Sequence, residues 1–399
     1  PFPEEQVTIA DHLSALGYET AVVGKTHFNN DLSHGFKHVL GNDYNEYLKT
    51  VNEPPLPDTI KVRPKWNLRA PASEWLNAAS ATSGHWDEYD KGTYYANQTA
   101  DFINQNKDNK FCIWIGFHEP HSPFNFPVEY QGKYNPDSLP FPQGSPEDDR
   151  WIPEAFRNLT EEEKRGIIRS YYTSVEYLDK NVGIILDGIK KAGIEDNTLV
   201  VYIGDHGYLL HHHKRFEKHS MWEEAVASPL IIKGFGQDKV INEMVEYVDL
   251  VPTLLDIIGE KPMNTVQGKS FYPLLTGKQE NHRDMVFSEY IPDNKAMVRT
   301  DRWKLIFTSG KKDLALGYET GYGPSGLLYK LYDQHKDPKE TTNLAYKPEY
   351  EHLVDSLRNE MLCIFRETHP KSDSIPDNLP VDEQLTLLCE PVDVGHKGY

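Results

Sequence analysis

The sequence predicts an α/β protein with a mixed, mostly parallel sheet flanked by helices, followed by a smaller C-terminal subdomain with an antiparallel sheet. Two observations lead to this fold class. In the first two-thirds of the chain, apolar runs such as 110–117 alternate with segments of helical spacing, as is typical of strands covered on both faces. From about Met285 the apolar runs become shorter and partly alternate with polar residues, which favours an antiparallel sheet. We therefore expect an α/β domain over residues 1–285 and a C-terminal subdomain over residues 286–399.

The individual elements follow from periodicity and from residues that start or stop them. The segment 160–193 has helical spacing, begins at the N-cap Thr160 with acidic residues in its first turn, and ends at Gly193. The remaining elements are expected as helices at 4–18, 93–106 and 347–368, and as strands at 20–24, 110–117, 197–207, 228–234, 285–290, 296–307 and 327–333. Two long stretches without clear periodicity, 25–90 and 119–159, are expected to carry small local elements or to line a functional surface.

Composition limits the partners of the protein. The chain has 399 residues and a formal net charge of −19, so neither a nucleic-acid backbone nor an anionic membrane is expected as the main partner. No apolar run approaches the roughly 18–20 residues of a membrane-spanning helix. Of the three cysteines, Cys112 lies in an apolar run and is expected in the core. The sequence does not decide whether Cys363 and Cys389 form a disulfide bridge. Oligomeric state is not predicted.

Ionisable residues follow several predicted strands of this acidic chain. Each has an ordinary interpretation by itself, as a solvated lysine, a capping histidine or a plain turn. Together they resemble the carboxyl edge of an α/β sheet, where ligands bind. They are Lys25 and His27 in "GKTH", His121 in "HEPHSP", Asp205 and His206 in "GDHG", and Lys218 at the end of the cationic run 211–218.

We expect these residues to converge in one cleft. Such a cleft would suit an anionic ester, either sulfate or phosphate. Its lysines and histidines, with a carboxylate that can bind a metal, would supply several preorganised cations to meet the charge of the ester. The cationic run 211–218 is expected to face that ester group rather than a polyanion.

At this point the chain resembles the formylglycine-dependent sulfatases of the alkaline phosphatase superfamily. "GYETAVVGKTH" is similar to their G-Y-x-T-x-x-x-G-K-x-H motif, and "FHEPHSPF" to their P-H-x-P motif. "GDHGYLLHHHKRFEKHSMWEE" resembles their D-[HN]-G…K-x-x-x-[YF]-[ED] segment. "VDLVPTLLDIIG", "RTDRWKLIF" and "LYDQHKDPKETTNLA" follow in the family's order, so the resemblance covers nearly the whole chain. "GFHEPHSPFNFPVEY" is most similar to the iduronate-sulfatase and choline-sulfatase branch.

The resemblance implies a role for each site residue. Asp205 and His206 would bind a divalent metal, usually calcium in this family, and the imidazole nitrogen leaves manganese as an alternative. Lys25 and Lys218 would bind sulfate oxygens, and His27 would assist the formylglycine. His121 would act at the leaving oxygen as sulfate ligand or general acid. His213 falls where relatives often have a histidine and is expected to bind substrate, whereas His118, His211, His212 and His219 have weaker claims.

The sequence departs from the family pattern at its beginning. The C/S-x-P-S/A-R motif, whose first residue becomes formylglycine, and the family's two adjacent aspartates do not occur in the printed residues. We therefore expect the formylglycine upstream of Pro1, and we expect the printed residues alone to be inactive.

The reaction implied is hydrolysis of a sulfate ester, on a small molecule or an oligosaccharide, to an alcohol and inorganic sulfate. One alternative is a phosphodiesterase or phosphonate monoester hydrolase of the same superfamily, and another is a non-catalytic remnant that binds a sulfated glycan. The family resemblance implies a periplasmic, secreted or lysosomal-type compartment. Aromatic residues of the two long stretches are expected either to stack on a sugar or to form loop cores: Tyr44, Tyr47, Trp66, Trp75, Trp86, Phe124 and Phe126.

Overall fold

The computed structural model describes residues 6–28, 32–65, 67, 70–235, 238–290, 295–309 and 327–389. It divides into two compact units. The first is formed by residues 1–141 and 159–199, and the second by residues 142–158 and 200–399. The domain boundary expected at residue 285 lies inside the second unit and stays a prediction.

The first unit contains a parallel three-stranded sheet. Its central strand is β1 (Glu19–Gly24), with β2 (His38–Leu40) and β3 (Phe111–Gly116) on either side. The middle of β1 is fully buried, as expected for an apolar strand covered on both faces. All three strands run in the same direction, so their carboxyl ends lie along one edge of the sheet.

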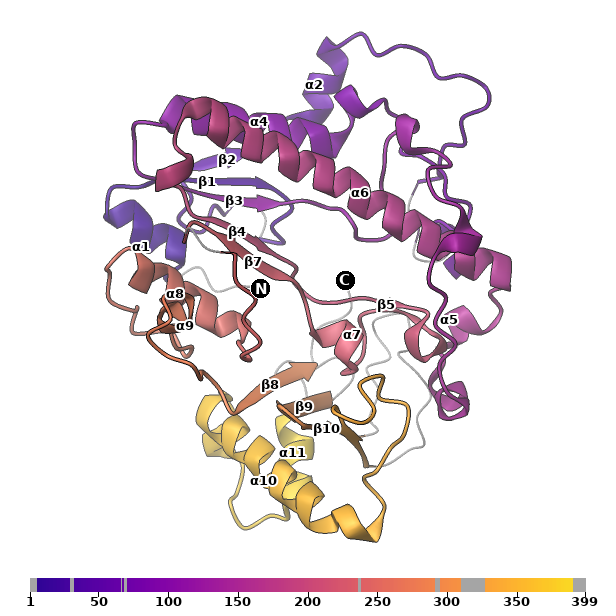
Figure 1. Ribbon diagram of the computed structural model, residues 1–399, viewed down its shortest axis with the longest axis vertical. Coiled ribbons are helices and arrows are strands. Elements are labelled where there is room, and N and C mark those ends of the chain that lie inside the picture. Colours follow the sequence, from indigo (N-terminus) through magenta and orange to yellow (C-terminus); the bar gives the residue numbers. More distant parts are fainter. Residues whose placement is uncertain are drawn as a thin grey trace. The chain divides into compact units, whose positions relative to one another are not determined.

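Two long helices cover this sheet within the first unit. Helix α4 (Lys91–Asn106) packs on β1 and β3, and α6 (Glu161–Ala192) packs on α4 (Figure 1). The cap residues expected from the sequence hold α6 at both ends: Thr160 forms a capping box with Glu163, and Gly193 takes the left-handed conformation. The shorter helices of this unit are α1 (Ile9–Ala15), α2 (Tyr44–Thr50) and α3 (Ala72–Trp75).

The second unit begins with a two-stranded antiparallel pair, β4 (Val200–Ile203) and β7 (Leu230–Lys233). Their apolar side chains pack against a cluster centred on Leu250, Phe271 and Leu274. A short hairpin, β5 (Leu209–Leu210) with β6 (Phe216–Glu217), carries the cationic run. The helices of this part are α5 (Glu154–Arg157), α7 (Glu223–Val226), α8 (Leu250–Ile257) and α9 (Tyr272–Leu275).

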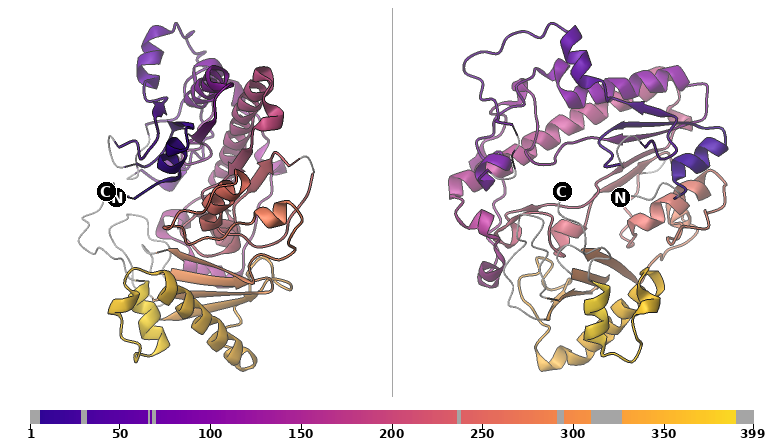
Figure 2. Two further views of the ribbon diagram at one scale, coloured as in Figure 1. Left: turned by 90° about the vertical axis from the view of Figure 1, so that its left-hand side faces the viewer. Right: turned by 180° about the vertical axis from the view of Figure 1, so that it is seen from behind.

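The C-terminal part of the second unit is a four-stranded antiparallel sheet in the order β11-β10-β9-β8. Helix α10 (Glu351–Thr368) packs on β9 and β10, and α11 (Val381–Leu388) packs beside α10 (Figure 2). The buried core between sheet and helices contains Leu305, Phe307, Met361 and Phe365. The expected antiparallel sheet is thus confirmed, with strands β8 (Met285–Tyr290), β9 (Lys295–Thr300), β10 (Trp303–Thr308) and β11 (Leu328–Asp333).

Several sequence expectations are refined by the structure. The segment expected as one strand at 296–307 is two strands, because Asp301 and Arg302 form the turn between β9 and β10. The helix expected at 4–18 is shorter and runs from Ile9 to Ala15 behind the N-cap Thr8, whereas residues 4 and 5 lie outside the described part. Cys363 is exposed, Cys389 is buried, and both are free thiols, so these two cysteines do not form a disulfide bridge.

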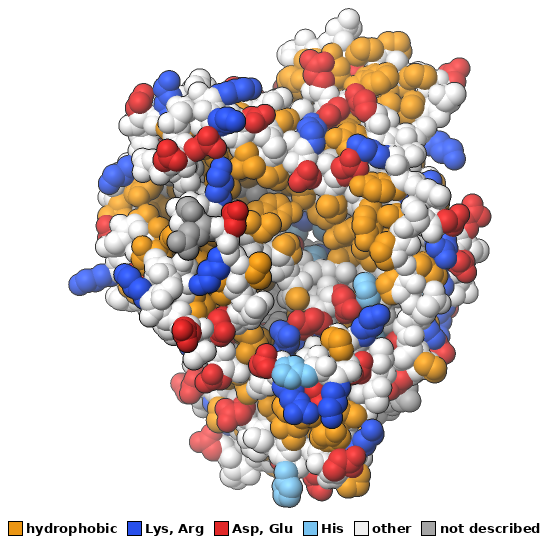
Figure 3. Space-filling view, in the orientation of Figure 1, with side chains coloured by type: hydrophobic (Ala, Val, Ile, Leu, Met, Phe, Trp, Pro, Cys, Tyr) orange, Lys and Arg blue, Asp and Glu red, His pale blue; other side chains and the backbone are white. Residues whose placement is uncertain are grey.

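The visible surface carries charges of both signs. On the face shown in Figure 3, Lys and Arg side chains lie among Asp and Glu side chains. Of the helices in the described ranges, none has both the length and the apolar character needed to cross a membrane.

Candidate active site

The ends of β1 and β3 bring the first group of predicted site residues together. The register pairs Gly24 with Gly116. A Cβ on Gly116 would lie 2.0 Å from the carbonyl oxygen of Lys25, and a Cβ on Gly24 would lie 2.4 Å from the carbonyl oxygen of Gly116. The Lys25 backbone N–H donates to the Gly116 carbonyl over 2.8 Å. Glycine at both positions therefore allows the ends of β1 and β3 to approach each other closely. As a result, Lys25 lies beside the start of the segment that carries His118 and His121.

Two histidines follow β3, and the structure distinguishes them. The rings of His118 and His121 lie 5.1 Å apart. Burial, with the nearby charges of His121 and Lys25, lowers the pKa of His118 to about 3, so His118 is neutral. Nδ1 of His121 donates to the carbonyl oxygen of Ser122 over 2.7 Å. That contact fixes the Nδ1–H tautomer of neutral His121, in which Nε2 carries the ring lone pair.

A buried carboxyl between these histidines escaped the sequence reasoning. Glu119 is 6% exposed and accepts a hydrogen bond from Nδ2 of Asn125 over 3.2 Å. The same amide nitrogen donates to Asp90 over 3.1 Å. Burial, with the adjacent Asp90 carboxylate, raises the pKa of Glu119 to about 7. The signal was present in "FHEPHSPF", where an acidic residue stands before a proline in an otherwise apolar segment.

The second group of predicted residues follows β4 in the "GDHG" turn. A Cβ on Gly207 would lie 2.2 Å from the carbonyl oxygen of Glu224, so glycine lets the turn lie directly against α7. Nδ1 of His206 donates to the Gly207 carbonyl over 2.7 Å. Its Nε2 is buried, makes no hydrogen bond to the described residues and lies 3.4 Å from Oδ1 of Asp205. Asp205 is itself exposed.

These two side chains fit a divalent metal ion. The His206 ring is held with its Nε2 lone pair toward the Asp205 carboxylate, as in metal-binding histidines whose other nitrogen is hydrogen-bonded. Burial and the charge of Lys218 lower the pKa of His206, which keeps the imidazole neutral and able to bind a metal near pH 7. An oxygen and a nitrogen donor alone do not select one metal.

The cationic run is only partly as expected. Most of it contacts the segment 142–151 of the same unit rather than standing free for a ligand: Nδ1 of His211 donates to the Pro142 carbonyl, His213 pairs with Asp148, Lys214 pairs with Asp149, and buried Arg215 donates to the Trp151 carbonyl. The expectation that the whole run faces an anionic ester is therefore wrong. These side chains anchor an acidic loop, and the spacing of its residues in the sequence gave no sign of the pairing.

Lys218 is the exception in that run. Among the residues that the structure describes, its side chain makes no ion pair or hydrogen bond, and it is half-buried. Its charge acts on His206 and on His219. A half-buried lysine without a carboxylate partner among the described residues can meet the charge of an external anion.

The two remaining predicted residues differ in exposure. His27 is exposed and has a positive φ of 53°. His213 is 3% exposed, and its ring stacks on Trp222 at 4.0 Å. Lys25, His27 and His121 thus belong to the first unit, whereas Asp205, His206, His213 and Lys218 belong to the second. Their convergence in one cleft stays a prediction.

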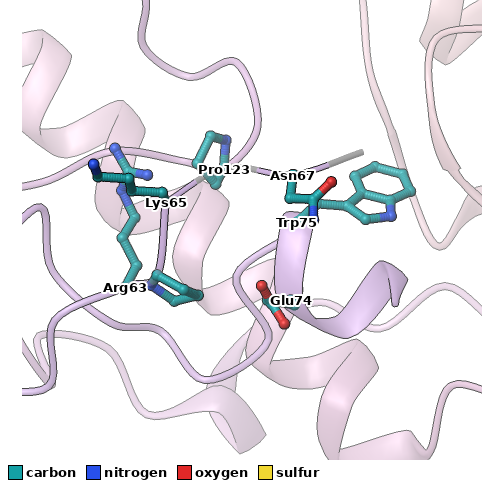
Figure 4. A pocket seen from close by; sticks show the side chains of 7 residues that line it. Arg63, Lys65, Asn67, Glu74, Trp75 and Pro123 are labelled. Carbon is teal, nitrogen blue, oxygen red and sulfur yellow. The ribbon is translucent and has the colours of Figure 1, made fainter. Parts of the chain in front are cut away.

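Most loop aromatics expected to meet a sugar or to form loop cores take the second role. Tyr44, Trp75, Phe124 and Phe126 are buried, whereas Tyr47 and Trp86 are partly exposed. Trp66 lies outside the described residues. A pocket of the first unit opens nearby, and Pro123, two residues beyond His121, is one of its walls; the others include Arg63, Lys65, Asn67, Glu74 and Trp75 (Figure 4).

Solved structures share this fold. A phosphonate monoester hydrolase from Silicibacter pomeroyi superposes with a TM-score of 0.72 at 21% identity, covering 94% of this chain and 82% of that one. A structure described as in complex with its substrate D-glucosamine-2-N,6-O-disulfate gives a TM-score of 0.66 at 20% identity, covering 95% and 85%. The fold is that of the alkaline-phosphatase-like hydrolases.

Sequence comparison identifies the family. The profile of the Sulfatase family matches residues 1–260. That of the N-sulphoglucosamine sulphohydrolase C-terminal region matches residues 211–367. The chain therefore belongs to the sulfatase family.

Three curated relatives have low sequence identity to this chain but match more than two thirds of it. The arylsulfatase of Clostridium perfringens is 25% identical over 89% of this chain and 77% of its own length. The choline-sulfatase of Rhizobium meliloti is 26% identical over 86% and 67%. Arylsulfatase K of Canis lupus familiaris is 26% identical over 68% of this chain. The match spans about half, 54%, of the length of that relative.

Proposed function

We propose that the protein hydrolyses a sulfate ester carried by a saccharide, releasing inorganic sulfate. The observation that carries the proposal is the arrangement after β4. A neutral His206 with an unpartnered Nε2 and the adjacent Asp205 carboxylate can bind a metal. Lys218, which has no carboxylate partner among the described residues, stands close enough for its charge to act on that histidine. A metal and a free ammonium together suit an anion with several oxygens.

Each predicted residue then has a role. Lys25 and Lys218 bind sulfate oxygens and meet the charge that grows on the leaving group. His121, when protonated at Nε2, donates that proton to the leaving oxygen or a hydrogen bond to a sulfate oxygen, since its Nδ1–H is engaged by the carbonyl oxygen of Ser122. His27 assists the nucleophile. His213 is proposed only as an indirect contributor to substrate binding, because its ring is buried against Trp222.

The metal is proposed to be calcium, with manganese as the alternative. When bound, such an ion supplies Lewis-acid stabilisation and a template for the sulfate oxygens. Asp205 and His206 would hold it, and the formylglycine typical of the family would supply the nucleophilic oxygen.

A saccharide is proposed as the alcohol because a structural neighbour is described with a disulfated glucosamine as its substrate. The pocket lined by Pro123 adds a physical reason: Arg63 and Lys65 on its wall would favour a second anionic group of the substrate (Figure 4). A periplasmic, secreted or lysosomal-type location is proposed from the family, as such substrates occur there.

The second candidate function is hydrolysis of a phosphonate or phosphate ester. The likeness of the fold to the phosphonate monoester hydrolase favours it. The two candidates share Lys25, His121 and Asp205, so they differ in the reacting atom rather than in these side chains.

The test is the release of inorganic sulfate by the full-length protein from a panel of sulfated mono- and disaccharides and aryl sulfates, measured by ion chromatography. We expect release from at least one saccharide and a loss of release in Lys218→Ala. Release from aryl sulfates alone would contradict the saccharide assignment but not the sulfatase activity.

A further inference from the structure

Three side chains of the second unit, outside the pair Asp205 and His206, form a compact cluster. They are His213 after β5, Glu224 on α7 and Glu340 in the loop after β11. Their ligand atoms all lie within 4.8 Å of one another. We infer that these three side chains bind a second divalent metal ion, of the zinc type, with a structural role.

His213 is oriented as a metal ligand. Its Nδ1 lies 3.0 Å from Oδ1 of Asp148, and both side chains are almost fully buried. The ring is fixed by stacking on Trp222 with an interplanar angle of 7°. Nε2 faces Glu224, whose Oε2 lies 3.9 Å away, and it makes no hydrogen bond to the described residues. A carboxylate on one ring nitrogen and a free second nitrogen is the usual arrangement of a zinc-binding histidine.

Glu224 offers an oxygen without a partner. Its Oε2 is buried and accepts no hydrogen bond from the described part of the chain. A buried carboxylate oxygen left without a donor is costly. Neither neighbouring histidine comes within hydrogen-bond distance of this carboxylate, because His212 and His213 lie 3.8 and 3.9 Å from it. An ion at the centre of the cluster would satisfy this oxygen.

Glu340 is the fixed member of the cluster. Its side chain is fully buried, and Oε1 accepts from Lys304 over 2.9 Å and from Gln334 over 2.8 Å. Within the described ranges, Oε2 accepts only from the backbone N–H of Glu223, over 2.7 Å. Because a carboxylate oxygen has two lone pairs, Oε2 keeps one for a metal.

The charge around the cluster favours a divalent cation. Four carboxylates meet here, those of Asp148, Glu223, Glu224 and Glu340. Apart from the two histidines, their direct ion-pair partners among the described residues are Lys304 and Arg299. With His212 and His213 neutral, these direct ion pairs leave two of the four carboxylates without a paired cation, although the charge of Lys339 also acts on His212. One divalent ion would neutralise these two carboxylates.

The donor set selects the metal class. One imidazole nitrogen and two carboxylate oxygens, with His212 near Glu224 as a further donor, suit four-coordinate zinc. Calcium requires six to eight oxygens and is poorly served by this set. The ion would tie the cationic run, α7 and the loop after β11 together within the second unit.

The test is a zinc titration of metal-free full-length protein against a chromophoric chelator. The background is the double variant Asp205→Asn/His206→Asn, which removes the first donor pair. We expect one equivalent of zinc to bind this background. Glu224→Gln should weaken binding more than about 100-fold, and Asp148→Asn, which acts through His213, about 10–100-fold. Glu162→Gln, at an exposed position of α6, is the matched control and should leave binding unchanged.

Thermal unfolding without metal checks each variant. Glu224 is partly exposed, so the isosteric glutamine should not prevent folding, and Asp148→Asn provides an independent test if it does. Zinc should raise the melting temperature of the background and not that of Glu224→Gln. No zinc uptake by the background, or equal uptake by Glu224→Gln, would overturn the inference and show that Asp148, His213 and Glu224 form a charge pair only.

Discussion

Gly24 and Gly116 face each other across β1 and β3 so closely that neither position has room for a side chain. This contact sets the spacing between Lys25 and the histidines that follow β3. We predict that Gly116→Ala lowers the free energy of unfolding by about 1–3 kcal/mol through overpacking. Because the added methyl group displaces the Lys25 backbone, we also expect turnover to fall.

Gly183→Ala is the matched control for this variant. It lies in the middle of α6 with open space around its Cβ position, and alanine in a helix interior is favoured over glycine by about 1 kcal/mol. Chemical denaturation should show Gly183→Ala as stable as the parent protein or more so. A Gly116→Ala protein with full stability and activity would contradict the close contact.

Lys218→Ala should reduce turnover far more than stability. A lysine that meets charge developing in the transition state contributes roughly 3–4 kcal/mol, or about two to three decades in rate. A solvated lysine would change either quantity by less than about 0.5 kcal/mol. Lys214→Ala is the control from the same run, because Lys214 is paired with Asp149. Steady-state kinetics and a denaturation curve of each variant measure the two effects. If turnover of Lys218→Ala falls by less than about fivefold, Lys218 is not part of the site.

Glu119 should make stability depend on pH. Its folded-state pKa of about 7 lies above the ordinary value of 4.5, so the folded protein favours the protonated form. The stability from this group is fully present below pH 4.5 and is lost as the pH rises through 7. At pH 8, Glu119→Gln should be more stable than the parent by up to about 3 kcal/mol, and near pH 4.5 the difference should vanish.

Thermal melts between pH 4.5 and pH 8 measure this difference, with Glu88→Gln at an exposed position as the control. A parallel pH dependence of Glu119→Gln and the parent protein would mean that Glu119 is ionised without cost in the folded state.

Metal removal should abolish activity, and His206 should determine how tightly the metal is held. We predict that dialysis against a chelator inactivates the protein and that calcium or manganese restores it. His206→Asn should need much more metal for half-maximal reactivation, since one of two described donors is lost. Because the pKa of His206 is lowered, reactivation of the parent protein should persist below pH 6.5. Reactivation of His206→Asn at the same metal concentration would exclude His206 as a ligand.

Local patterns predicted the elements of this fold well. Helix α6 was predicted almost to the residue because Thr160, Glu163 and Gly193 act within its own ends. The strand-end position of Lys25, His121 and Asp205 followed from the apolar runs that precede them.

The parts that could not be predicted depend on contacts distant in sequence. The pairing of the cationic run with residues 142–151 leaves no periodic signal, so the run was misread as a ligand surface. Glu119 was missed for a related reason: its raised pKa arises from burial beside Asp90, and neither burial nor that neighbour is visible in a local motif. The sequence could not decide the role of the buried loop aromatics. An aromatic residue in an irregular segment gives the same sequence pattern whether its side chain packs in the core or binds a ligand.

The most direct test of the sulfatase assignment compares two substrates with the same leaving group. We would measure kcat/KM of the full-length protein for 4-nitrophenyl sulfate and for the 4-nitrophenyl monoester of phenylphosphonate. The assignment predicts a kcat/KM at least about tenfold higher for the sulfate, a difference of about 1.4 kcal/mol in transition-state stabilisation. A higher kcat/KM for the phosphonate would contradict it and identify the protein as a phosphonate ester hydrolase.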